Sequence, residues 1–152
     1  MAAITMTCPD CSAPTSLGVG QSFVPGHLVW YESFHCNACG RATEADGDGV
    51  PPTTIRDAII NSEGYWGLHV DLVGPERLSV CKILRCDLNS DICDVPAMKN
   101  RLPGIVFGGT RAEMDWLSSR LAAFGYKSTV VEADRGALPD SIDYSKGRCT
   151  EG

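Results

Sequence analysis

Two Cys-x-x-Cys motifs near the start of the chain constrain its fold more than any other feature. Cys8 and Cys11 form the first motif, Cys36 and Cys39 form the second, and 24 residues lie between them. Two such motifs can place four sulfur ligands at the corners of a tetrahedron, which is the arrangement of structural zinc sites. We therefore expect these four cysteines to hold one zinc ion.

Other uses of four cysteines fit this pattern less well. Disulfides are rare in the cytosol, and a thioredoxin-like redox pair needs one motif in a βαβ context. An iron–sulfur cluster also accepts four thiolates, so iron remains an alternative to zinc. His35 adjoins the second motif, and we interpret it as a strand-end residue because four cysteines already complete the site. A site filled by four protein ligands has no open position, so the metal is expected to fold the segment rather than to catalyse.

The segment between the motifs has the pattern of a β-hairpin. One arm is predicted at residues 20–24, a Pro-Gly turn at 25–26 and a second arm at 27–35. Gly40 follows the second motif, where a tight turn favours a residue that tolerates positive φ. The segment resembles a zinc ribbon, and we place this domain at residues 1–42.

Composition changes twice after the ribbon. Residues 43–53 are acidic and glycine-rich and include two prolines, which is typical of a linker. Residues 134–152 are polar without sustained periodicity, so we expect much of this tail to be loose. The second compact domain is therefore predicted at residues 54–133.

Periodicity and capping signals predict mixed secondary structure in this second domain. Thr54 is expected to cap a first helix, and Pro96 indicates that another helix begins near Asp94, because proline is tolerated in a first turn. The predicted elements are a helix at 53–61, a strand at 66–72, helices at 78–85 and 94–101, an extended connection at 102–107, a helix at 111–124 and a strand at 126–131.

The helix at 111–124 carries the clearest signals. Thr110 and Glu113 have the spacing of a capping box, and Gly125 is a stop signal. Its apolar face is predicted from Met114, Leu117, Leu121 and Phe124.

The second domain resembles the C-terminal domain of the bacterial ribosomal stalk protein, a fold shared in outline with the Clp protease adaptor. The matching segments are the strand at 68–72, residues 80–85, residues 99–106, the Gly-Thr helix start and residues 121–126. The resemblance implies the order βααβαβ, with an antiparallel sheet and helices on one face. The whole chain is thus expected to be α+β.

This resemblance implies protein binding and no chemistry. In the stalk family a helical face with basic residues recruits translation factors, and Lys82 and Arg85 lie at matching positions. The family's Gly-Leu-Gly is replaced here by residues 88–90, and Pro96 lies where that family continues its helix. Both changes fall on the factor-binding surface and weaken the expectation of a ribosomal role.

Charge and hydropathy limit the remaining classes of function. The formal net charge is −6, which disfavours nucleic acid and favours a basic protein partner. Arg41 is the one basic residue of the predicted ribbon. No stretch approaches the roughly 20 apolar residues of a membrane helix, and the first residues lack a signal-peptide pattern. We therefore expect a cytoplasmic protein.

No catalytic set is recognisable in the sequence. Cys81, Cys86 and Cys93 lie in or next to predicted helices without an adjacent histidine, and Cys149 lies in the tail. We expect a non-catalytic zinc protein that binds another protein, for example as a cytoplasmic immunity or inhibitor protein. An adaptor or translation-associated factor and a nucleic-acid-binding zinc ribbon are the alternatives.

Overall fold

The chain forms two compact units, Met1–Gly64 and Tyr65–Gly152, which are described separately. The computed structural model describes residues 2–24, 26–72, 74–88 and 95–141. Both units combine strands and helices, and all strand pairs are antiparallel, so the predicted α+β class is confirmed.

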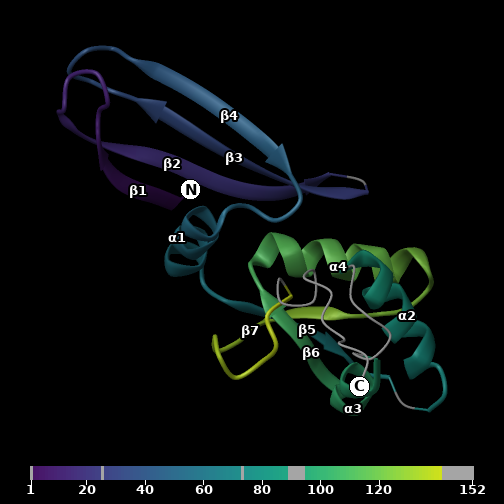
Figure 1. Cartoon of the computed structure of the whole chain (residues 1–152). Coiled ribbons are helices and arrows are strands. Elements are labelled where there is room, and N and C mark those ends of the chain that lie inside the picture. Colours follow the sequence, from purple (N-terminus) through teal and green to yellow (C-terminus); the bar gives the residue numbers. More distant parts are fainter. Residues whose placement is uncertain (1, 25, 73, 89–94, 142–152) are drawn as a thin grey trace, which may run out of the picture. The chain divides into compact units, whose positions relative to one another are not determined.

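The first unit is a four-stranded meander with one helix (Figure 1). The strands lie in the order β1-β2-β3-β4, and the predicted hairpin is confirmed as β2 and β3. The elements are β1 (Ala2–Thr7), β2 (Pro14–Val24), β3 (His27–His35), β4 (Ala42–Asp48) and α1 (Thr53–Glu63).

The prediction of a linker at residues 43–53 was wrong. Residues 42–48 form β4, which pairs with β3 along its whole length. Every residue of β4 is exposed except the half-buried Gly47, so the strand has no apolar alternation that a sequence pattern could reveal. Pairing with β3 decides its conformation against the low strand propensity of glycine and aspartate.

Helix α1 belongs to the first unit and not to the second domain, so the predicted boundary at 54 moves to 65. Ile55 and Ile59 of α1 are buried against Ala2 and Val19 of the sheet. The predicted cap is also wrong, because the helix begins after Pro52 without a side-chain capping bond.

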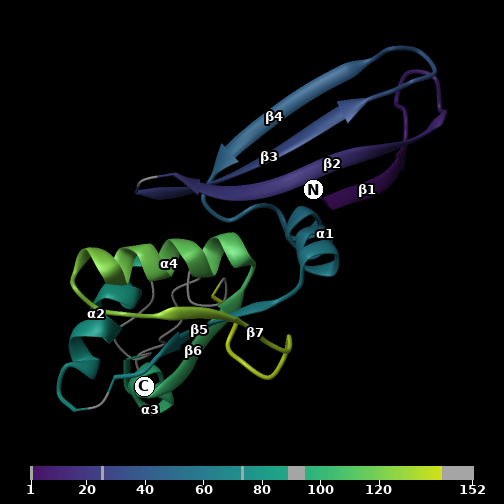
Figure 2. The ribbon, with the colours of Figure 1, turned by 180° about the vertical axis from the view of Figure 1, so that it is seen from behind.

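The second unit has the predicted order βααβαβ (Figure 2). Its three strands lie in the order β6-β5-β7, and α4 packs against all three. The elements are β5 (Trp66–Val70), α2 (Arg77–Asp87), α3 (Val95–Arg101), β6 (Gly104–Gly109), α4 (Arg111–Ala123) and β7 (Thr129–Glu132).

All three helices of this unit share one core with the sheet. Leu68 and Val70 alternate inward from β5, as predicted, and meet apolar side chains from α2, α3 and α4. These helix residues are Val80, Cys81, Leu84, Met98, Met114, Leu117 and Leu121. The helices therefore cover one face of the sheet.

Helix α4 begins as the sequence predicts. The Glu113 amide donates to Thr110 Oγ1 at 3.2 Å, and the Thr110 amide donates to Glu113 Oε1 at 3.2 Å. Phe124 was assigned to the apolar face wrongly: it is 59% exposed, because it caps the C-terminal end beyond the last core-facing turn. Trp116 is partly buried and packs against the core.

Two segments are more ordered than their sequences suggest. The connection predicted at 102–107 overlaps β6, which spans Gly104–Gly109, and Pro96 lies near the start of the described part of α3. In the predicted tail, Pro139 accepts a hydrogen bond from the Gly108 amide at 3.0 Å, and Ser141 is buried. The tail from residue 142 onward, with Cys149, lies outside the described residues, as does the predicted helix start at Asp94.

Within the described ranges, no helix is both long enough and apolar enough to cross a membrane.

Candidate metal centre

The two Cys-x-x-Cys motifs fold into the same backbone turn. In the first, the Ser12 amide donates to the Cys8 carbonyl at 2.8 Å, and the Cys8 amide donates to the Ala13 carbonyl at 2.9 Å. The second turn repeats both bonds. The Gly40 amide donates to the Cys36 carbonyl, and the Cys36 amide donates to the Arg41 carbonyl, at 2.8 Å each. Each turn thus presents its two cysteines in the same way.

Each turn requires a left-handed residue at the position after its second cysteine. Gly40 takes this position in the second turn with φ of 78°, as its sequence context predicts. Ser12 takes it in the first turn with φ of 60°, although non-glycine residues rarely adopt this conformation. Serine carries no sequence signal of this strain, so the position of Ser12 was not predicted.

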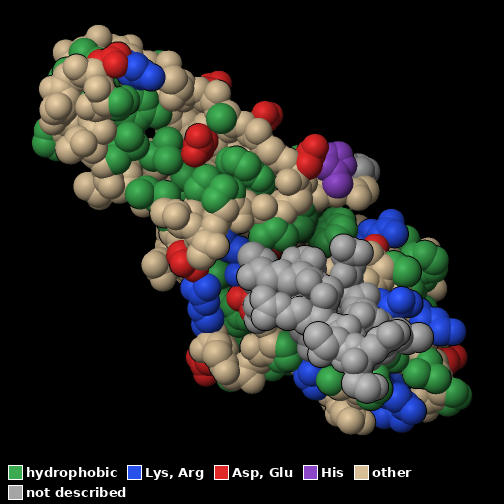
Figure 3. Space-filling view, viewed as in Figure 1, with side chains coloured by type: hydrophobic (Ala, Val, Ile, Leu, Met, Phe, Trp, Pro, Cys, Tyr) green, Lys and Arg blue, Asp and Glu red, His purple; other side chains and the backbone are tan. Residues whose placement is uncertain are grey.

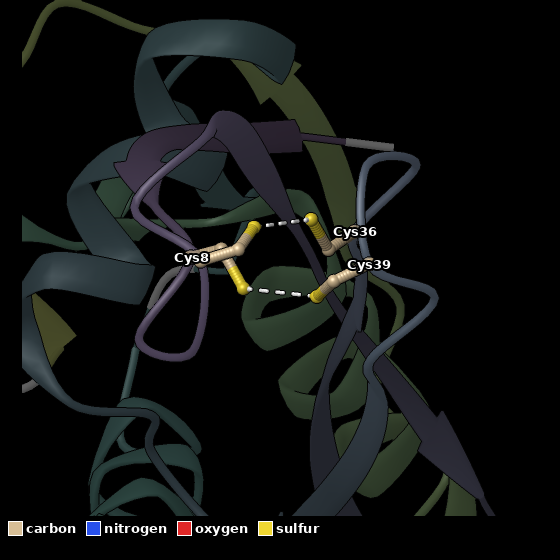
Figure 4. Close-up of side chains that lie close together, drawn as sticks. Cys8, Cys36 and Cys39 are labelled. Carbon is tan, nitrogen blue, oxygen red and sulfur yellow. Dashed lines mark hydrogen bonds between the residues drawn. The ribbon is translucent and has the colours of Figure 1, made fainter.

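The turns bring all four predicted sulfur atoms together, within 4.8 Å of one another (Figure 4). The Cys8 and Cys39 sulfurs are 3.6 Å apart, and the Cys11 and Cys36 sulfurs are also 3.6 Å apart. A disulfide needs about 2.05 Å, so these thiols are free. Four sulfurs at about 2.3 Å from one ion would be about 3.8 Å apart, which fits these distances.

The cluster lies at one end of the first unit, on a small apolar base. Cys8 and Cys36 are buried, at 2% and 1% exposure, and Phe34 of β3 is buried with them. Cys11 and Cys39 are exposed. One side of the site is therefore packed against protein, while the other faces solvent.

Hydrogen bonds within the cluster shift the pKa values of Cys11 and Cys36 in opposite directions. The Cys39 amide, assisted by the Ala38 amide, lowers the pKa of the Cys36 thiol to about 6. At Cys11 the Ala13 amide favours the thiolate, but hydrogen bonding with Cys36 and other neighbouring thiols, with loss of hydration, raises the pKa to about 12. A bound dication would remove this conflict, so the donor set suits a metal ion that prefers thiolates.

An ion pair joins the two turns outside the sulfur cluster. Arg41 Nη1 donates to Asp10 Oδ1 at 2.6 Å, and this carboxylate raises the pKa of the guanidinium. His35 points to a different partner, since its Nδ1 lies 3.2 Å from Asn37 Oδ1. This agrees with its interpretation as a strand-end residue.

The remaining cysteines do not join a metal cluster within the described part of the chain. Cys81 is buried in the core of the second unit, whereas Cys86 is exposed. Cys93 and Cys149 lie outside the described residues.

No family model matches this sequence, and neither a curated protein nor a solved structure matches it. The resemblance to the ribosomal stalk domain therefore remains a prediction.

Proposed function

We propose that this chain is a zinc-binding protein whose single ion is structural, and that it acts by binding another protein rather than by catalysis. The observation that carries the proposal is the cluster of Cys8, Cys11, Cys36 and Cys39, whose sulfurs lie within 4.8 Å of one another. Four thiolates would complete a tetrahedral site and leave no position for water or substrate. The ion would supply folding free energy to a unit with small apolar clusters.

The distribution of charge supports a basic protein as the partner. Residues 1–64 contain two basic and seven acidic side chains, which gives this unit −5 of the formal −6. One of its two cations, Arg56, is buried at 2% exposure. Figure 3 shows acidic side chains spaced along this unit, whereas Lys and Arg are concentrated over the second unit. A ribbon with this charge would repel a phosphate backbone, which disfavours nucleic-acid binding.

One form of this function is a cytoplasmic immunity or inhibitor protein whose acidic surface covers a basic toxin. The alternative is an adaptor or translation-associated factor, which the βααβαβ order of the second unit favours. Lys82 and Arg85 on α2 are the residues that would contact a factor in that case.

Metal analysis of the purified chain tests the first half of the proposal. We expect one zinc per chain by mass spectrometry, with loss of the metal in Cys11→Ser and retention in Cys86→Ser, which removes an exposed thiol outside the cluster. Stoichiometric iron with visible absorbance would mean that the four cysteines hold an iron–sulfur cluster instead of zinc. Absence of any metal would contradict the proposal.

Capture of partners from the native host with the zinc-loaded, tagged chain tests the second half. We expect a stoichiometric protein complex that a nuclease does not disrupt and that weakens as salt is raised. Binding to nucleic acid with a steep salt dependence, or turnover of a substrate by the isolated chain, would contradict protein binding as its function.

A further inference from the structure

We propose that the first unit binds an extended basic segment of its partner, which adds to the sheet as a fifth strand beside β4. This inference rests on the proposed function, because it assigns the surface and the partner chemistry that protein binding would use. The surface, termed the acidic edge, comprises Tyr31 and Ser33 on β3 and Glu44, Asp46 and Asp48 on β4.

The first component of the acidic edge is an open strand. In the part of the chain that the structure describes, β4 pairs with β3 on one side and ends the sheet on the other. Residues 42–46 are all exposed. The outer side of such a strand presents backbone N–H and C=O groups that an extended peptide can pair with.

The second component is a regular row of negative charge. Glu44, Asp46 and Asp48 alternate along β4, so they lie on one face at intervals of about 7 Å. Among the described residues, no cation pairs with Glu44 or Asp46. Asp48 lies 3.6 Å from His27 Nε2, and both side chains are largely exposed.

The third component is a surface hollow of about 520 Å³ beside this row. Tyr31 lies directly opposite Asp46, and Ser33 lies opposite Glu44, and both pairs line the hollow. The Tyr31 ring leans away over Gly20 of β2, where an added Cβ would be 2.2 Å from the ring. The ring therefore packs toward β2 and not toward β4.

These components together select a basic β-strand as the occupant. Lysine or arginine at alternate positions of an added strand would lie opposite the carboxylates. A second copy of this chain would oppose its own acidic row across a β4–β4 pair, and like charges opposite one another are destabilising.

Fluorescence anisotropy with two peptides of equal composition tests the geometry. The first alternates four lysines with four threonines, and the second has four lysines followed by four threonines. We expect the zinc-loaded chain to bind the alternating peptide more tightly, with amide shifts in β4 by NMR. Glu44→Gln with Asp46→Asn should weaken binding roughly three- to tenfold, since exposed charge pairs contribute modestly. Asp57→Asn with Glu63→Gln, the matched loss of charge on α1, should change it less than about twofold.

Four results would overturn the inference. Equal affinity for the two peptides, or an equal loss of affinity in the two double variants, would show that binding is non-specific electrostatic attraction. A dimer that disappears in Glu44→Gln with Asp46→Asn would assign the edge to a second copy. A native partner that binds this variant with unchanged affinity would refute the acidic edge while leaving the protein-binding function intact. The zinc content of each variant is measured separately, so a loss of metal is distinguished from a loss of binding.

Discussion

At the scale of single residues, the metal centre contains two equivalent positions with different side chains. Ser12 and Gly40 both have positive φ, and an added Cβ at Gly40 would contact nothing within 4 Å. Only backbone conformation should therefore separate the two positions. We expect Ser12→Gly to stabilise the zinc-loaded unit and Gly40→Ala to destabilise it, each by about 1 kcal/mol. Urea unfolding of the zinc-loaded variants measures both, and changes of the same sign would contradict this reading.

Cys81 and Cys86 lie on the same helix in opposite environments. Burial raises the pKa of the Cys81 thiol, whereas Cys86 is exposed. We expect Ellman's reagent to modify Cys86 in the native chain and to reach Cys81 only on unfolding.

The raised pKa of Cys81 also predicts a pH effect on stability. A raised pKa means that the folded state favours the neutral thiol, so its contribution is complete below the unfolded value of about 8.5 and declines as pH rises beyond it. Cys81→Ala should make the stability of the second unit depend less on pH in the alkaline range. An unchanged pH profile in that variant would exclude Cys81 as a contributor.

The residues of the site were predictable because spacing alone determines them. Two Cys-x-x-Cys motifs separated by a hairpin leave the four sulfurs few other arrangements, and the structure brings together those four. Ser12 was missed because serine carries no signal of positive φ. The exposure of Phe124 was missed because helical periodicity does not reveal where the last core-facing turn ends.

At the scale of elements, two glycines lie beneath tyrosine rings with different freedom to move. An added Cβ would lie 2.2 Å from the Tyr31 ring at Gly20 and 2.4 Å from the Tyr65 ring at Gly108. Tyr31 is 39% exposed and can swing into solvent, whereas Tyr65 is 6% exposed. We expect Gly108→Ala to cost about 1–3 kcal/mol and Gly20→Ala clearly less. Hydrogen exchange, resolved for each unit, measures the loss of stability in each variant, and equal losses would contradict the distinction.

Elements with strong local signals were predicted, whereas strand β4, which has none, was not. Helix α4 follows from Thr110, Glu113 and its apolar spacing, because these signals act within the helix itself. Strand β4 is specified by its neighbour β3, so residues 42–48 resemble a linker in isolation. The same dependence on neighbours explains why residues 139–141 resembled a loose tail.

At the scale of the whole molecule, the two units differ in what stabilises them. Among its described residues, the second unit has one continuous core of thirteen buried residues, none of which belongs to the sulfur cluster. The first unit has buried clusters of four and three residues, and two of the latter three are Cys8 and Cys36. A unit of this size with so little apolar burial is expected to need its metal to fold.

Removal of the metal should therefore unfold the first unit and leave the second folded. We expect a strong chelator to collapse the amide NMR signals of residues 2–64 into the unfolded range while the signals of residues 65–141 persist. Cys11→Ser should give the same spectrum without chelator, and restoring zinc should recover the wild-type spectrum but not that of the variant. Loss of signals from both units would mean that the core around Leu68 and Leu117 does not suffice, because the second unit would then depend on the metal through the first.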